Sequence, residues 1–430
     1  MVNASVLRGP KDAQDARAIP WIISVDDHVT EPPDLWTSRL PARLKARGPQ
    51  VRRGPVKTAS DPLRGKTQFD VPGGRIGDYW IYEGKPVGSV LTPITHAVGI
   101  EGDRIVNHPM TYDEINAGAW KQDARLKDMT SNHVEASLCF CNAVSGYCGQ
   151  LYLRQPDKEL ALACLEAYND WMIDDWCAGE GRGRLIPLIL IPLWDVGLAV
   201  AEVRRCAAKS AISVSFCENP HELGLASIYS GYWDPFFEAC AETGTCISMH
   251  IGSSGKIPTT APDAPYMMTS ILMFVDSMTS TLDYILAGVF ERFPTLKIAF
   301  SEGQIGWLPY AVRRADKVWL AKDKETTGYK RTPKPPSSYV AGHVYGCIFD
   351  DDTALLCRDL IGMGQIMMEV DYPHSACAFP NVVEVATGLA EVAGLDAQER
   401  HKLFRGNAIE AYGLERLGIQ HTSNMNLLVS

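Results

Sequence analysis

The sequence alternates short, continuous apolar runs with longer segments in which apolar residues recur every three or four positions. Short apolar runs predict strands that are buried on both faces, and the three- and four-residue spacing predicts amphipathic helices that cover them. The predicted strands occupy residues 22–28, 136–141, 185–193, 212–217, 246–252, 297–303, 345–349 and 365–373. A regular alternation of strands and helices is typical of an α/β fold built on a parallel sheet.

Two parallel architectures fit this alternation, an open doubly wound sheet and a closed barrel. An open sheet normally has a glycine-rich phosphate-binding sequence after its first strand, and none follows residues 22–28. Eight strands over about 400 residues instead match the size of a (β/α)8 TIM barrel. We therefore expect a single barrel domain that spans residues 1–430.

The stretch between the first predicted strand and the next helix is too long for a simple loop. We predict a long insertion over residues 37–115, with basic and proline-rich parts followed by a hairpin. The hairpin signal is Glu83-Gly84 between two apolar segments, residues 80–82 and 86–90. Connections that follow barrel strands lie at the catalytic end, so we expect the insertion to act as a lid or an oligomer contact.

Composition restricts the class of protein. With 46% hydrophobic residues and a formal net charge of −10, the chain is expected to be a globular protein that does not bind nucleic acid. No apolar stretch reaches the roughly 20 residues of a membrane span, and no secretory signal opens the sequence. We therefore predict a cytoplasmic protein whose 12 cysteines are reduced and mostly buried.

Polar side chains follow the apolar runs where several predicted strands end. Asp26 and His28 are two positions apart on the first strand, so both side chains can face the mouth of the barrel. His250, Glu302 and Asp371 end three later strands. Each residue alone has an ordinary structural explanation, such as a helix cap or a buried hydrogen bond. Together, at one end of a barrel, the five predict a site for a divalent metal such as Zn, Mn or Fe.

A series of ordered motifs gives the sequence a specific resemblance. The motifs are SVDDHVTEPPDLW, RLKDM, AYNDW, RLIPLILIPLWD, SMHIGSSG, FSEGQIGWLP, VDYPHS and RGNAIEAYGL. In these motifs the chain resembles the amidohydrolase-related family, the branch of the amidohydrolase superfamily that contains aminocarboxymuconate-semialdehyde decarboxylase and related aromatic-acid decarboxylases. The resemblance implies a distorted (β/α)8 barrel with a divalent metal. It also implies that Asp26 and His28 occupy the first-strand His-x-His position, with His250 and Asp371 as further ligands.

The resemblance implies a reaction as well. Asp371 would exchange protons with a metal-bound water or with the substrate, so Asp371, His250 and Glu302 are the expected catalytic residues. His374 and Glu31 are the expected substrate-binding residues, and a surface loop histidine is the alternative for His374. The expected reaction is hydrolysis or non-oxidative decarboxylation of a small carboxylate- or amide-containing substrate.

The sixth predicted strand departs from the family pattern. Many relatives have a histidine there, whereas this chain has Glu302 between Ser301 and Gly303. A glutamate changes the charge of the site and could hold a second metal, and a carboxylate-rich site favours Mn or Fe over a lone Zn. The site is then also similar to those of dinuclear iron–manganese oxygenases that hydroxylate a small amino acid or organic acid.

Three functional hypotheses therefore stay open. The first is the metal-dependent hydrolase or decarboxylase, and the second is an oxygenase whose two metals are bridged by carboxylates among Asp26, Glu302 and Asp371. The third is a non-catalytic or partner-dependent subunit that assembles through the insertion. We expect a small-molecule substrate, no nucleic-acid or membrane partner, and a homodimer or higher oligomer, or else a hetero-oligomer with a related subunit.

Overall fold

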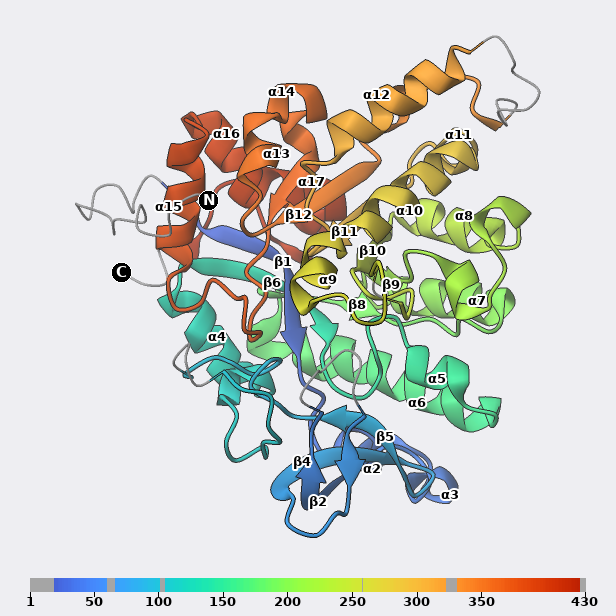
Figure 1. The fold of residues 1–430 in the computed structure, drawn as a ribbon, viewed down its shortest axis with the longest axis vertical. Helices are drawn as coiled ribbons and strands as arrows, with labels where there is room; N and C mark the ends of the chain where they lie inside the picture. Colours follow the sequence, from blue (N-terminus) through green and yellow to red (C-terminus); the bar gives the residue numbers. More distant parts are fainter. Residues whose placement is uncertain (1–18, 60–65, 101–104, 257, 322–330, 426–430) are drawn as a thin grey trace.

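A computed structural model describes residues 19–59, 66–100, 105–256, 258–321 and 331–425 of the chain. Its centre is a ring of parallel strands with helices on the outside (Figure 1). The strands are β1 (Ile22–Val29), β6 (Val134–Cys141), β7 (Leu185–Ile186), β8 (Leu188–Ile189), β9 (Ser213–Phe216), β10 (Cys246–His250), β11 (Ile298–Ser301), β12 (Val344–Ile348) and β13 (Ile366–Met368). Each overlaps one of the predicted apolar runs, so the predicted order of strands in an α/β fold is confirmed.

The ring is assembled from two parallel sheets, one of β1, β6 and β7 and the other of β8 to β13. Pro187 separates β7 from β8, because proline has no backbone N–H to contribute to the ladder. On the opposite side, the backbone N–H of Asp371 donates to the carbonyl of Asp26 (2.9 Å), and that of His28 donates to the carbonyl of Tyr372 (2.6 Å). These bonds join β1 to the segment after β13 and close a distorted barrel.

Three strands end earlier than the apolar runs that predict them. β10 ends before Gly252, β11 before Glu302 and β13 before Asp371, and these three residues have φ angles of 76°, 51° and 58°. A left-handed backbone cannot continue a strand ladder. The ends of these runs are therefore turns at the mouth of the barrel.

The main outer helices follow the strands in the predicted alternation (Figure 1). They are α4 (Gln122–Ser131), α6 (Lys158–Trp171), α7 (Val196–Ala207), α8 (Asp234–Thr243), α10 (Val275–Leu286), α12 (Leu308–Trp319) and α15 (Val382–Val392). Asp157 and Asp195 begin α6 and α7 by accepting hydrogen bonds from the backbone N–H groups of Leu160 and Leu198. Such N-caps satisfy donors that have no partner within the helix.

An apolar cluster fills the inside of the ring. It includes Ile23, Leu138 and Met367 from the strands, and α17 (Asn407–Tyr412) adds Ala408 and Tyr412. The barrel is therefore a packed core, and polar side chains are left to gather at its mouth.

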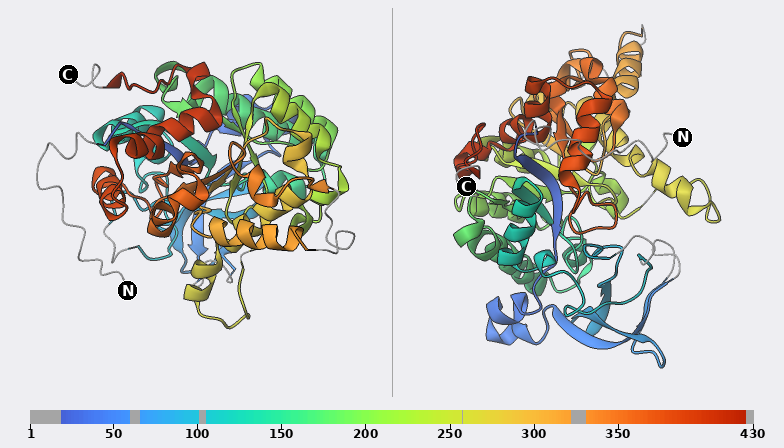
Figure 2. Two further views of the ribbon diagram at one scale, coloured as in Figure 1. Left: turned by 90° about the horizontal axis from the view of Figure 1, so that it is seen from above. Right: turned by 90° about the vertical axis from the view of Figure 1, so that its left-hand side faces the viewer.

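A separate antiparallel sheet lies between β1 and α4 in the sequence. It consists of β3 (Gln68–Phe69), β2 (Gln50–Lys57), β4 (Arg75–Tyr82) and β5 (Lys85–Val90), in this order. Glu83 and Gly84 join β4 to β5 with φ angles of 48° and 75°, as a two-residue hairpin turn requires. This confirms the predicted hairpin. The sheet lies at one end of the barrel, beyond the carboxyl end of β1 (Figure 2).

Within the described ranges, none of the helices is both long enough and apolar enough to cross a bilayer. All 12 cysteines lie in those ranges and are unpaired. Ten of them are buried, and Cys357 and Cys377 are half-buried. The cysteines therefore serve as small apolar residues of the core.

Candidate metal centre

Five polar side chains from four strand ends meet at the mouth of the barrel. Asp26 and His28 lie on β1, His250 ends β10, Glu302 directly follows β11, and Asp371 lies three residues after the end of β13. Ligand atoms of the first four lie within 4.8 Å of one another. The structure thus brings together all five residues that the sequence places in the metal site.

β1 presents two of these residues because its side chains alternate between faces. Asp26 and His28 point into the mouth, whereas Asp27 accepts a hydrogen bond from the backbone N–H of Tyr372 (3.0 Å). His28 Nε2 lies 3.8 Å from Asp26 Oδ1 and 3.2 Å from Asp371 Oδ1. Burial lowers the pKa of His28 well below its usual value, which keeps the imidazole neutral and able to bind a metal.

The ring of His250 is oriented by its own backbone. Nδ1 donates to the carbonyl oxygen of Ile251 at 2.7 Å, so Nε2 is the ring nitrogen that faces the cluster. Nε2 lies 3.6 Å from Asp26 Oδ2 and 3.5 Å from Glu302 Oε1. A histidine whose second nitrogen donates to a carbonyl is the usual arrangement of a metal ligand.

Glu302 is held in the left-handed region, where a residue other than glycine costs about 1–3 kcal/mol. Its backbone N–H donates to Oε2 of Glu369 at 2.9 Å. Glu369 is completely buried and follows β13 directly. The Glu369 carboxyl therefore fixes the backbone that carries the Glu302 side chain into the mouth.

His374 joins the cluster from the loop after Asp371. Its Nδ1 lies 2.9 Å from Asp371 Oδ1, and its Nε2 bonds to Oδ1 of Asn142 at 2.8 Å. Both partners are acceptors, so both ring nitrogens carry protons. Burial lowers the pKa of His374, but Asp371 and Glu302 outweigh burial and raise it to about 10. The resulting imidazolium stacks on the ring of His28 at a centroid distance of 3.7 Å.

The surroundings shift the pKa values of the carboxyl groups in different directions. Burial raises the pKa of Asp371 to about 7, against the opposing effect of His374. Burial and the neighbouring carboxylates raise the pKa of Asp26 well above its usual value. Burial also raises the pKa of Glu302, but His250 and His374 outweigh it and hold that pKa well below its usual value. The site therefore crowds carboxyl groups together in a place that favours a cation.

Several buried atoms of the cluster have no hydrogen-bond partner among the described residues. They include both carboxylate oxygens of Asp26, both ring nitrogens of His28 and Nε2 of His250. Buried polar atoms are costly when they are left without a partner. Oxygen and nitrogen donors that converge in this way fit a divalent ion of the Mn, Fe or Zn type.

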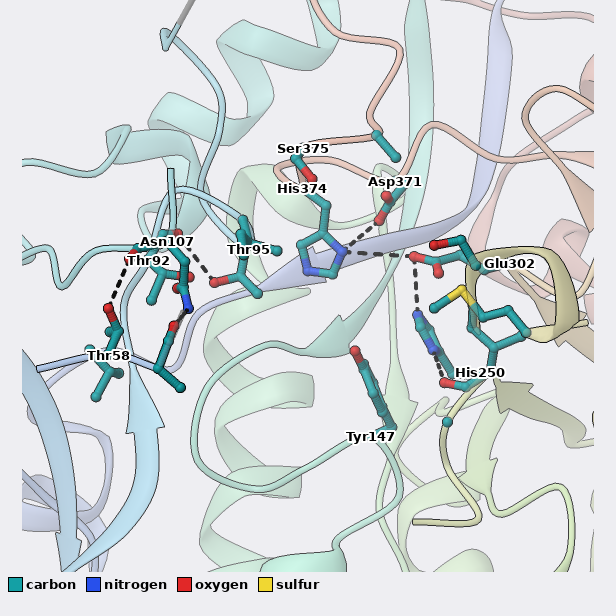
Figure 3. Close-up of a pocket in the computed structure, with 18 of the residues that line it drawn as sticks. Thr58, Thr92, Thr95, Asn107, Tyr147, His250, Glu302, Asp371, His374 and Ser375 are labelled. Atoms are coloured by element: carbon teal, nitrogen blue, oxygen red, sulfur yellow. Dashed lines mark hydrogen bonds and ion pairs between the residues drawn. The ribbon is translucent and has the colours of Figure 1, made fainter. Parts of the chain in front are cut away.

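The cluster lies at one end of a cavity of about 550 Å³ (Figure 3). The side chains of His250, Glu302, Asp371 and His374 line this end. The other lining residues include Tyr147 from the loop after β6, and Thr58, Thr92, Thr95 and Asn107 from the segment that contains the antiparallel sheet. A small molecule in the cavity can therefore reach the cluster.

Glu31 does not line the described part of this cavity. It is completely buried, and its carboxylate accepts hydrogen bonds from the backbone N–H groups of Ala143 (2.8 Å), Val144 (3.2 Å) and Ser145 (3.1 Å). The prediction that Glu31 contacts the substrate is therefore wrong, and its role is structural. Glu31 holds the loop that follows β6.

Sequence reasoning missed three residues of the site, namely Asn142, Tyr147 and Glu369. Asn142 and Tyr147 follow a barrel strand, as the predicted ligands do, so their position was a usable signal. The signal for Glu369 was its spacing of two from Asp371 at the end of an apolar run. In none of the three does the residue type alone distinguish a site residue from an ordinary one.

Comparison with known proteins decides the family. A family model described as amidohydrolase matches residues 108–414. The chain belongs to the amidohydrolase family. The family assignment confirms the resemblance carried by the motifs and makes this protein an enzyme of the amidohydrolase superfamily.

Three relatives of this amidohydrolase illustrate the range of similarity. The 2-amino-3-carboxymuconate-6-semialdehyde decarboxylase of Dictyostelium discoideum is 24% identical over 311 residues, which are 71% of this chain and 80% of that protein. An amidohydrolase structure from Mycobacterium avium subsp. paratuberculosis K-10 is 22% identical, with a TM-score of 0.67 over 93% of this chain and 99% of that chain. A dihydroxybenzoic acid decarboxylase from Polaromonas sp. JS666, solved with manganese and the inhibitor 2-nitroresorcinol, is 17% identical, with a TM-score of 0.55 over 75% and 93%. The structural similarities support the barrel fold.

Proposed function

We propose that this amidohydrolase is a metal-dependent, non-oxidative decarboxylase of a small aromatic or unsaturated carboxylate. The observation that carries the proposal is the buried cluster at the end of the cavity, in which the side-chain oxygens of Asp26 and ring nitrogens of His28 have no hydrogen-bond partner among the described residues. The names of two relatives, both decarboxylases, favour decarboxylation over hydrolysis.

Asp26, His28, His250 and Asp371 would hold the divalent metal. Glu302 would complete this set or bind a second ion. When bound, the metal polarises an oxygen of the substrate and compensates the negative charge that develops during the reaction. The carboxylate-rich donor set, together with the manganese of the Polaromonas relative, favours Mn over Zn as the working metal.

Asp371 and His374 are arranged to handle the proton that decarboxylation requires. The bond between the carboxyl group and the substrate carbon breaks, CO2 leaves, and the electron pair stays on the carbon until it takes a proton. Asp371 Oδ1 and His374 Nδ1 lie 2.9 Å apart at the wall of the cavity, so a proton is held beside the substrate. Asp371 then delivers the proton, and the His374 cation stabilises the carboxylate that remains.

Residues 37–115 would form an insertion that sets substrate specificity. Thr58, Thr92, Thr95 and Asn107 belong to this segment and line the cavity across from the metal ligands. Hydroxyl and amide groups offer hydrogen bonds to the part of the substrate that does not react. This role agrees with the expected position of an insertion at the catalytic end of a barrel.

Isotopes distinguish decarboxylation from hydrolysis. Manganese-loaded protein is incubated with 2,6-dihydroxybenzoate and other aromatic carboxylates in D2O and, separately, in water enriched in oxygen-18. Decarboxylation releases CO2 and leaves deuterium on the substrate carbon that carried the carboxylate, whereas hydrolysis places oxygen-18 in the organic product. Only the organic product is analysed for oxygen-18, because CO2 exchanges its oxygen atoms with water. Metal-free protein is the control, and it should regain activity with Mn. Oxygen-18 in the organic product, or no turnover of any carboxylate, would contradict the proposal.

One feature of the site bears on the dinuclear oxygenase alternative. Its ligand atoms form two overlapping groups, which share His28 and Glu302. The first group adds Asp26 and His250, and the second adds Asp371 and His374. The relatives give the oxygenase no support. Oxygen consumption by protein that contains both iron and manganese, measured with an oxygen electrode, would favour it over the decarboxylase.

A further inference from the structure

Tyr147 lies at the metal end of the cavity in the loop between β6 and α5 (Gln150–Arg154). Its ring lies flat on the imidazole of His250, with a centroid distance of 4.0 Å and an interplanar angle of 7°. The edge of the same ring faces His28 at 6.2 Å. The phenol is therefore in fixed contact with two of the proposed metal ligands.

The loop that carries Tyr147 is held from several sides. Glu31 accepts hydrogen bonds from three successive N–H groups near the start of the loop. Further along, the hydroxyl of Ser215 donates to the carbonyl of Tyr147, and the side-chain amide of Gln150 donates to the carbonyl of Ser253 at 2.6 Å. The scaffold positions the tyrosine, so its own hydroxyl is not needed to hold it.

No hydrogen bond joins the hydroxyl of Tyr147 to any other described residue. Figure 3 shows this hydroxyl directed into the space between His250 and His374. Among the buried tyrosines, Tyr112 donates to the carbonyl of Glu31 at 2.7 Å, whereas the hydroxyls of Tyr82 and Tyr284 have no hydrogen-bond partner among the described residues. Tyr147 differs from Tyr82 and Tyr284 because it lines the cavity. A tyrosine hydroxyl in a largely buried place normally finds a partner. The partner of Tyr147 would therefore be a molecule in the cavity.

We propose that Tyr147 is a catalytic residue whose hydroxyl donates a hydrogen bond to an oxygen of the reacting group of the substrate. The inference rests on the proposed decarboxylation, in which negative charge moves from the carboxylate into the rest of the substrate. A donor that is already in place when this charge develops stabilises the transition state. The chemical class of substrate is accordingly a carboxylate with an acceptor oxygen, such as a phenolate or enolate oxygen, close to the carbon that reacts.

The test compares Tyr147→Phe with Tyr152→Phe. Tyr147→Phe keeps the ring on His250 and removes only the hydroxyl. Tyr152→Phe removes a hydroxyl from the same part of the chain, which bonds to Ser145 Oγ at 3.2 Å and lies outside the cavity lining. We expect Tyr147→Phe to lower kcat/KM about 100-fold, mainly through kcat, with unchanged metal content. We expect Tyr152→Phe to stay within a few-fold of the wild type in activity.

A binding measurement keeps the test independent of turnover. The probe is 2-nitroresorcinol, titrated calorimetrically into manganese-loaded wild type and both variants. At least tenfold weaker binding to Tyr147→Phe alone supports the proposal. Equal affinity of wild type and Tyr147→Phe overturns it, and so does loss of metal from Tyr147→Phe, which would make the residue a support for His250. If the wild type binds the probe but decarboxylates nothing, the proposed reaction fails, while the titration still decides the role of the hydroxyl.

Discussion

Both ends of the barrel bury ionisable side chains, but the two ends differ in whether these side chains have hydrogen-bond partners. At the amino end, Arg405 is completely buried and fully bonded. It forms two bonds with Glu135, of 2.7 and 3.0 Å, and it also donates to the carbonyls of Trp21 and Gln420. At the carboxyl end, both carboxylate oxygens of Asp26 have no hydrogen-bond partner among the described residues.

This difference indicates that the amino end contributes to stability and the carboxyl end to function. A buried ion pair that is fully bonded holds elements together, and here it ties the start of β6 to the C-terminal part of the chain. Buried groups that lack partners oppose folding unless a ligand completes them. Changes at the amino end should therefore affect unfolding, and changes at the carboxyl end should affect metal binding and catalysis.

The largest expected effect is that of Asp371→Asn. An amide cannot deliver the proton, so we expect kcat to fall about 10²–10⁴-fold. The metal-free variant should unfold at the same temperature as the metal-free wild type or higher, because one carboxyl of a crowded group is removed. CO2 release and thermal unfolding measure the two effects. A large loss of stability in the metal-free variant would break the contrast between the ends.

At the opposite end, Arg405→Leu leaves Glu135 buried without its partner. We expect the free energy of unfolding to fall by about 3–5 kcal/mol, with kcat/KM of the folded protein unchanged. Urea denaturation measures the loss. The matched control is the double variant Arg405→Leu with Glu135→Leu, which should recover part of the stability because no buried charge is left alone. A single variant as stable as the wild type would contradict the structural role of the pair.

Glu218 sharpens the comparison, because it is a buried carboxyl at the carboxyl end that lies outside the metal cluster. It follows β9, Ser277 donates to its Oε1 at 2.6 Å, and its Oε2 has no hydrogen-bond partner among the described residues. Burial raises the pKa of Glu218 from 4.5 to about 8. The folded state therefore binds the proton more tightly than the unfolded state does. The stabilisation from this proton is complete below pH 4.5 and is lost as the pH rises through 8.

The variant Glu218→Gln tests this sign. Relative to the variant, the wild type should lose stability progressively between pH 5 and pH 8, as measured by urea denaturation at a series of pH values. Glu238→Gln, which changes an exposed carboxyl on α8, is the control and should follow the wild type. Parallel pH curves for wild type and Glu218→Gln would show that the carboxyl is ionised in the folded protein.

The smallest of these effects concerns Glu369, which reaches the metal only through another residue. Glu369→Leu removes the acceptor for the backbone N–H of Glu302, so the left-handed turn loses its support. We expect metal affinity to fall about 10–100-fold, as measured by competition with a chelator. Glu369→Gln retains an acceptor oxygen and should stay close to the wild type. Equal metal affinities of the wild type, Glu369→Leu and Glu369→Gln would show that Glu369 does not support the metal site.

The sequence predicted the parts of the molecule that follow from local patterns. Continuous apolar runs marked the strands, and the two-residue spacing of Asp26 and His28 placed both on one face. What it could not predict depends on contacts between distant segments. The length of β13 depends on the left-handed turn at Asp371, and the role of Glu31 depends on a loop more than a hundred residues further along the chain.

The same limit applies to Tyr147, whose loop is held by contacts from β9 and from the loop that follows β10. A tyrosine in a loop of mixed composition carries no pattern that separates a substrate contact from a surface residue. Two features of the folded structure set it apart: its ring lies on His250, and its hydroxyl has no hydrogen-bond partner among the residues that the structure describes. Residues on strands are thus predictable from spacing, and residues on loops require the folded structure.

The His374 cation has a consequence for how the enzyme matures. It lies between Asp371 and Asn142 and places a positive charge within the group of carboxylates from the moment the chain folds. This charge offsets part of the repulsion among these acids before an ion is bound. We expect the metal to bind reversibly after the chain has folded. A cell whose supply of metals changes could then exchange the metal in existing protein without new synthesis.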